Sequence, residues 1–113
     1  MANHLKRGRE VLDLEIDALR EIRARVGPEF TAAVEALESA VSRKRKIILT
    51  GVGKSGHIGR KIAATFTSTG APAVFLDPLD AEHGDLGLLA RGDILVALSY
   101  SGETGELARL LPL

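Results

Sequence analysis

Hydrophobic side chains recur every three or four residues along the first part of the chain, a spacing typical of helices with one apolar face. One such stripe covers residues 5–26 and a second covers residues 30–41. Between them, Gly27 suits the left-handed cap that ends a first helix, and Pro28 suits the first position of a second. The pattern therefore predicts a helical hairpin at the start of the chain.

Three short apolar runs follow, at residues 47–49, 73–76 and 94–98, and none of them alternates polar with apolar side chains. Strands that are apolar throughout are typical of parallel sheets covered on both faces. Helical spacing over residues 58–69, between the first two runs, predicts a βαβ unit.

The remaining segments complete an α/β arrangement. Residues 77–91 form a longer connection, with a short turn of helix expected near residues 86–89, and a last helix is expected over residues 102–111. We expect an α/β domain at residues 47–113, with the helical hairpin of residues 1–46 packed against it.

Composition narrows the classes of function. Lys and Arg number 15 and Asp and Glu number 15, so the formal net charge is zero, whereas nucleic-acid-binding domains usually carry a basic surplus. No apolar run is long enough to span a membrane, and the first residues lack the apolar core of a signal peptide. The absence of Cys excludes disulfides and thiol catalysis. We expect a cytoplasmic protein without nucleic-acid or membrane partners.

The polar chemistry follows the apolar runs. Ligands of open α/β sheets bind at the carboxyl ends of the strands, where the strand order reverses. If the first strand is central, the turns after strands one and three face each other there, and both are helix N-termini that attract anions. These turns carry a cation and four hydroxyl groups: Lys54, Ser55, Ser99, Ser101 and Thr104. This combination suits a phosphate monoester, although Ser55 and Ser101 could equally be helix N-caps.

Two other phosphate motifs compete for the turn at residues 51–56. A P-loop would need a glycine where Ile48 stands inside a strand, so that motif fails. The same turn does fit G-x-G-x-x-G, and Asp77 ends the next strand, where dinucleotide folds have a ribose-binding acid. A dinucleotide leaves the hydroxyl cluster after the third strand unexplained, but this alternative stays open.

Three segments resemble one family in the order expected for it. Residues 50–66, Thr-Gly-Val-Gly-Lys-Ser-Gly-His-Ile-Gly-Arg-Lys-Ile-Ala-Ala-Thr-Phe, are similar to the first turn of the sugar isomerase (SIS) domain of arabinose 5-phosphate isomerases. Residues 82–87 resemble that family's His-Gly-Asp-Leu-Gly segment, and residues 99–104 resemble the Ser-rich phosphate turn of SIS domains. The resemblance implies a flavodoxin-like, three-layer parallel sheet. The family has five strands, so we expect the C-terminal strands to be missing here.

The resemblance also implies an activity and a set of site residues. The family interconverts ribulose 5-phosphate and arabinose 5-phosphate through an enediol, on the route to the Kdo sugar of lipopolysaccharide or capsule, without a cofactor. Lys54, Glu103 and His83 match positions held to be catalytic or to line the site. His83 is also a weak candidate for a metal ligand, whereas His57, in the first turn of a helix, is expected to pack or cap. The positions that would hold the phosphate are Gly53, Ser55, Ser99, Ser101, Gly102 and Thr104.

The chain departs from the family by stopping early. Family members supply a further Glu and His from the second half of the domain, and usually carry regulatory CBS domains after it. A third strand with an open apolar edge invites pairing with another chain, so we expect a homo-oligomer, which in the family is a tetramer. Two alternatives to a phosphopentose isomerase stay open: a non-catalytic phosphosugar-binding module and a dinucleotide-binding fragment.

Overall fold

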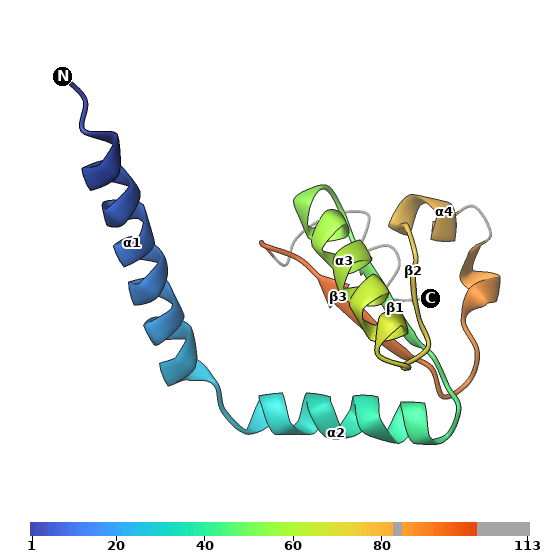
Figure 1. The fold of residues 1–113 in the computed structure, drawn as a ribbon. Coiled ribbons are helices and arrows are strands. Elements are labelled where there is room, and N and C mark those ends of the chain that lie inside the picture. Colours follow the sequence, from blue (N-terminus) through green and yellow to red (C-terminus); the bar gives the residue numbers. More distant parts are fainter. Residues whose placement is uncertain (83–84, 102–113) are drawn as a thin grey trace. The chain divides into compact units, whose positions relative to one another are not determined.

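The computed structural model of the chain describes residues 1–82 and 85–101 (Figure 1). The helix expected over residues 102–111 lies outside this part. The described elements, in chain order, are α1 (His4–Arg25), α2 (Pro28–Ser42), β1 (Ile47–Gly51), α3 (Lys54–Ser68), β2 (Ala73–Phe75), α4 (Pro78–Glu82), the 3₁₀ helix η1 (Asp85–Leu88) and β3 (Ile94–Leu98). Within the described residues, no helix is long and apolar enough to cross a membrane.

The chain divides into two compact units, Met1–Val34 and Glu35–Leu113, with the boundary inside α2. The side chain of Asn3 caps α1 by accepting a hydrogen bond from the Lys6 N–H at 3.0 Å. Pro28 begins α2 as predicted. The predicted left-handed cap at Gly27 was wrong, because Val26, which follows the last residue of α1, is extended and Gly27 is not among the glycines of positive φ. An extended linker makes the break between the helices instead.

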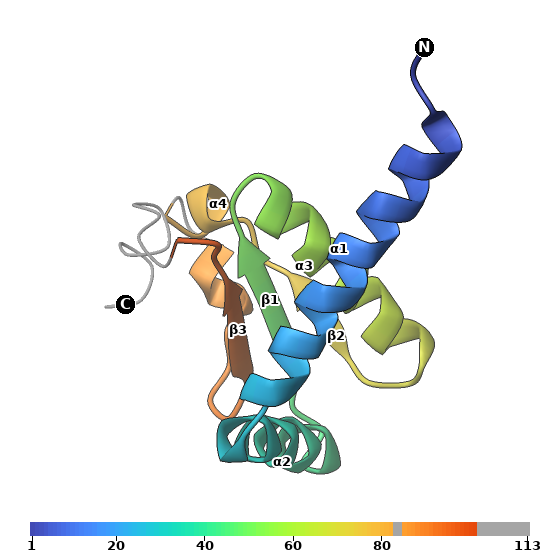
Figure 2. The same ribbon diagram turned by 90° about the vertical axis from the view of Figure 1, so that its left-hand side faces the viewer.

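The sheet has β1 at its centre, in the order β2-β1-β3, and both pairings are parallel. Figure 2 shows β1 between its two neighbours. Every residue of β1 is buried. The three strands and the central position of the first one are therefore confirmed, and the carboxyl ends of β1 and β3 lie next to each other.

The two faces of β1 contact different residues, because successive side chains of a strand point in opposite directions. Ile47 and Leu49 pack with Ala63 of α3 and with partly buried side chains of α2 and α3. Ile48 packs on the other face with Leu76, next to partly buried side chains of the connection and of β3. Burial on both faces explains why the first apolar run does not alternate with polar residues.

Helix α3 begins at Lys54, four residues before the expected start at residue 58. The turn before it is short because Gly53 adopts a φ of +62° and serves as the N-cap. A Cβ atom on Gly56 would lie 2.7 Å from the carbonyl oxygen of Gly51, so helix and strand approach each other more closely than any larger residue allows. Gly51 and Gly56, which were expected in a turn, thus allow a close packing contact between β1 and α3.

The connection after β2 contains a helix that the sequence pattern missed. Asp77 Oδ1 accepts hydrogen bonds from the N–H groups of Leu79 at 2.9 Å and Asp80 at 3.4 Å, and Pro78 takes the first position of α4. The short helical turn expected near residues 86–89 is present as η1. A helix as short as α4 has too few turns to produce a periodic pattern, so only its Asp-Pro start could have indicated it.

Lys46 and Asp93 join the segments that lead into β1 and β3. The Asp93 side chain is 5% exposed, and its carboxylate accepts hydrogen bonds from the N–H groups of Lys46 at 3.0 Å and Ala90 at 2.8 Å. It also forms an ion pair with the Lys46 ammonium group. The hydrogen bond from the Lys46 side chain lowers the pKa of Asp93 from 3.8 to about 2, against the opposing effect of desolvation.

Acid should therefore destabilise this unit through Asp93. Because the folded-state pKa lies below the unfolded-state value, the stabilisation is present above roughly pH 4 and is lost as the pH falls toward 2. Its size is about 2 kcal/mol. We expect Asp93→Asn to lower the free energy of unfolding by about that amount at pH 7, with a smaller difference at pH 3. Urea unfolding at both pH values measures this, with Asp80→Asn as the control; a difference independent of pH would contradict it.

Candidate functional site

The carboxyl ends of β1 and β3 enclose a cavity of about 480 Å³. Its lining comes from the turn after β1 and the start of α3, together with the segment after β3: Val52, Lys54, Ser55, Tyr100 and Ser101. The expectation that these two turns converge is thus confirmed for Lys54, Ser55 and Ser101. The volume is typical of small-molecule sites.

Ser55 is not the N-cap of α3. Gly53 occupies the cap position and makes no side-chain capping hydrogen bond, so this alternative for Ser55 was wrong. The half-buried Ser55 hydroxyl and the exposed Lys54 ammonium group make no side-chain hydrogen bond or ion pair within residues 1–82 and 85–101. Both groups are therefore available to a ligand in the cavity.

The start of α3 adds backbone donors to this cavity. The first N–H groups of a helix have no intrahelical acceptor, and the helix dipole makes this end attractive to anions. Lys54 and Ser55 are the first residues of α3, so a cation and a hydroxyl accompany those donors. Such an arrangement can hold a phosphate group, and Lys54 can also stabilise negative charge that develops on a neighbouring oxygen.

Several predicted site residues lie outside the part of the chain that the structure describes: His83, Gly102, Glu103 and Thr104. Their roles stay predictions, as do those of Gly53 and Ser99, which lie in the two turns. The described residues contain no group of three or more His, Asp or Glu side chains that could hold a metal ion.

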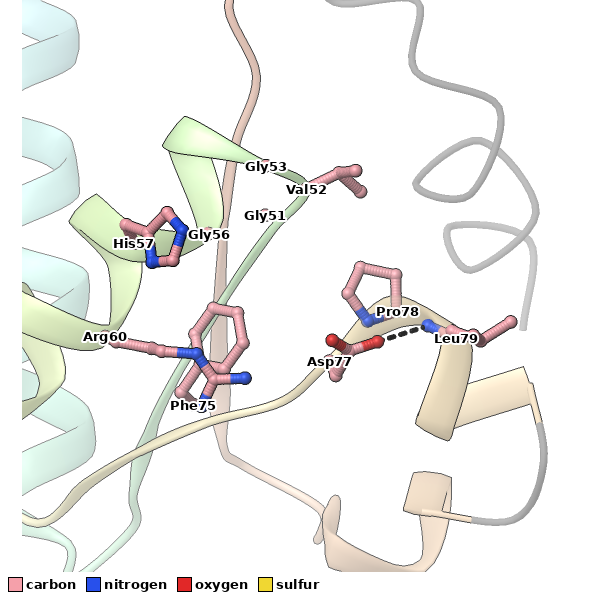
Figure 3. Close-up of a pocket in the computed structure, with 10 residues that line it drawn as sticks. All are labelled: Gly51, Val52, Gly53, Gly56, His57, Arg60, Phe75, Asp77, Pro78 and Leu79. Atoms are coloured by element: carbon pink, nitrogen blue, oxygen red, sulfur yellow. Dashed lines mark hydrogen bonds between the residues drawn. The ribbon is translucent and has the colours of Figure 1, made fainter.

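A second cavity, of about 340 Å³, lies on the β2 side of the same turn (Figure 3). Its polar lining comes from His57 and Arg60 of α3 and from Asp77 after β2. His57 was expected to pack or to cap the helix. It is instead exposed, and it lines this cavity. The i, i+3 spacing of His57 and Arg60 puts both on one face of α3, a signal that the sequence does contain.

A family model described as the SIS domain matches residues 40–113, which is well over half of the chain. The chain belongs to the SIS domain family. This SIS domain is also similar to solved structures. A Bacteroides fragilis protein assigned as a phosphosugar isomerase involved in capsule formation has a TM-score of 0.91 and 40% identity, over 97% of this chain and 57% of that one.

A second solved structure carries a ligand. The Escherichia coli CFT073 protein, solved in complex with arabinose 5-phosphate, has a TM-score of 0.84 and 38% identity, over 98% of this chain and 59% of that one. The predicted fold, an α/β SIS domain with a parallel sheet, is thereby confirmed.

Curated relatives share one name. Arabinose 5-phosphate isomerase KdsD of Francisella tularensis is 42% identical over the whole of this chain, and that of Escherichia coli K12 is 46% identical over 93% of it. The SIS domain described here spans 35% and 31% of the length of these two relatives.

Proposed function

We propose that this SIS domain binds a phosphorylated pentose and forms part of an aldose–ketose isomerase that interconverts ribulose 5-phosphate and arabinose 5-phosphate. The observation that carries the proposal is the cavity where Lys54, Ser55 and Ser101 meet at the carboxyl ends of β1 and β3. The relatives named arabinose 5-phosphate isomerase and the structural neighbour solved with arabinose 5-phosphate support the same substrate class.

The phosphate would lie between the two turns. The N-terminal N–H groups of α3 and the Ser55 hydroxyl would bind it from one side, and Ser99, Ser101 and Thr104 from the other, with Gly53 and Gly102 allowing close approach of the backbone. Binding of the phosphate would anchor the C5 end of the pentose relative to the two turns. The reacting carbons would therefore have a defined position above the sheet.

The isomerisation moves a proton between C2 and C1 through an enediol. Glu103 would be the base that removes the C2 proton of the aldose and returns it to C1 of the ketose. Lys54 would stabilise the oxyanion that forms on the neighbouring oxygen, and His83 would assist ring opening near neutral pH. We propose no cofactor for this chemistry and no metal role beyond the weak candidate His83.

We extend the proposal to the assembly of the protein and its role in the cell. Three apolar side chains of α1, those of Leu5, Leu12 and Leu19, are 62–74% exposed, and β3 pairs with β1 alone in the described part of the chain. We propose that residues 1–46 form a helical hairpin that packs on an SIS domain within a homo-oligomer. We also propose cytoplasmic action on the route to Kdo.

The alternative to the isomerase is a phosphosugar-binding module without catalysis, which the next experiment separates from it.

Solvent exchange tests the function directly. The chain is incubated with arabinose 5-phosphate in D₂O, and the C2 proton of the sugar is followed by NMR. Loss of the C2 signal, beyond the rate without protein, is the expected result for an isomerase. Substrate line broadening without exchange would favour the binding module, and neither effect in a folded sample would overturn the phosphosugar proposal.

Removal of the Ser55 hydroxyl should weaken phosphosugar binding. Ser55→Ala loses one hydrogen bond to a charged phosphate, and we expect the Kd for arabinose 5-phosphate to rise roughly tenfold. Ser68→Ala, at the other end of α3, is the matched control and should leave the Kd unchanged. Calorimetric titration measures both values. Equal affinity of the two variants would contradict the role of Ser55.

A further inference from the structure

The cavity on the β2 side of the turn has a lining that phosphopentose binding does not use. Three polar side chains line it, and within the described residues none of the three has a charged partner: His57, Arg60 and Asp77. Asp77 uses its Oδ1 atom to cap α4 and leaves Oδ2 without a hydrogen-bond donor in the described part of the chain. Two basic side chains and an acidic one thus face a single hollow without pairing (Figure 3).

Arg60 is held in a defined orientation. Its guanidinium carbon lies 4.1 Å from the centre of the Phe75 ring, a cation–π contact that holds the guanidinium group at the wall of the cavity. Guanidinium planes are also surfaces on which nucleobases stack.

Asp77 and the glycine turn follow adjacent strands, in the arrangement found in nucleotide-binding folds. Asp77 follows the second of two adjacent parallel strands, and residues 51–56 follow the first with the spacing G-x-G-x-x-G. In nucleotide-binding folds, an acid at this place accepts hydrogen bonds from a ribose diol, and the glycine turn faces a phosphate. The contact between Gly56 and Gly51, where an added Cβ would lie 2.7 Å from the carbonyl oxygen, gives the last glycine its packing role.

We propose that this cavity is a second ligand site, separate from the phosphosugar cavity, and that it takes a ribonucleoside monophosphate. The base stacks on the Arg60 guanidinium group, the ribose diol donates to Asp77 Oδ2, and the phosphate lies at the turn beside His57. The volume of about 340 Å³ is within the range of small-molecule sites. Val52 lines both cavities, so a ligand in one of them lies next to the other.

The test uses the ¹⁵N-labelled chain and AMP as the probe. We expect saturable shifts of the amide signals of Gly53, His57 and Arg60. The Kd should rise about tenfold or more for 2′-deoxy-AMP, since the diol to Asp77 is then incomplete, and likewise for Asp77→Asn, which keeps the cap of α4. Arg60→Lys keeps the charge but loses the stacking plane and should weaken AMP in the same way. Lys61→Met, an exposed neighbour that lines neither cavity, should leave the Kd unchanged.

Other outcomes would overturn the proposal. Inorganic phosphate that binds as tightly as AMP would reduce the site to a phosphate site. Shifts confined to Lys54, Ser55 and Ser101 would put AMP in the phosphosugar cavity. Absence of shifts in a chain whose spectrum is folded would leave no nucleotide site. None of these results depends on isomerase activity, so failure here is distinguishable from failure of the proposed function.

Discussion

Lys54→Met should abolish most of the C2 proton exchange of arabinose 5-phosphate. The methionine side chain keeps the length and much of the apolar stem of lysine but carries no charge, so the oxyanion of the enediol loses its cation. Removal of one such electrostatic group typically costs about 10²–10³-fold in rate. The ground-state affinity should fall less, because in the proposed complex the hydroxyl groups and the helix N-terminus would still hold the phosphate.

The NMR exchange assay measures this loss as a rate at saturating sugar phosphate. Lys61→Met is the matched control, because Lys61 is an exposed residue of the same helix and lines neither cavity. It should exchange the C2 proton at the rate of the unaltered chain. If Lys54→Met did so as well, Lys54 would have no part in the chemistry.

Gly56→Ala should destabilise the unit of residues 35–113. The new Cβ atom would lie 2.7 Å from the Gly51 carbonyl oxygen, and the backbone fixes the positions of both atoms, so neither can rotate away. Overpacking of this kind costs about 1–3 kcal/mol, which outweighs the gain of up to about 1 kcal/mol in helix propensity. The separation of α3 from β1 would also displace Lys54 and Ser55.

Urea unfolding followed by circular dichroism gives the free energy of unfolding for this variant. Gly8→Ala provides the comparison, because a Cβ atom there meets nothing within 4 Å and only the helix propensity changes. We expect Gly8→Ala to be neutral or slightly stabilising. A similar result for Gly56→Ala would mean that the contact with Gly51 is not required.

Burial decides which parts of the fold the sequence could predict. The three strands were predictable because each is a continuous apolar run, and β1 is buried on both faces. The start of α3 was not, because glycine has the same low helix propensity whether it bends a loop or allows a close contact. Only the distance between Gly56 and Gly51 distinguishes the two cases, and that distance depends on the sheet.

The candidate site was predictable where one motif contains the residues. Lys54 and Ser55 share a turn, and their approach to Ser101 followed once β1 was central. The second cavity was harder to predict, since Phe75 ends β2 and Asp77 follows it, and both reach the cavity beside Arg60 only after β2 pairs with β1. Asp77 was singled out from its position alone, whereas Arg60 was not.

The central position of β1 has a consequence for the synthesis of the chain. Of the three strands, β1 leaves the ribosome first, but it pairs with β3, which is synthesised last. Lys46, just before β1, likewise cannot form its ion pair until Asp93 has been synthesised. Until that residue emerges, one edge of this buried strand lacks the neighbour that it has in the folded sheet. Parallel pairing between distant segments is slow to form, and nascent chains in this state are prone to aggregate. We therefore expect aggregation, and binding by chaperones, to be favoured in the interval between translation of β1 and of β3.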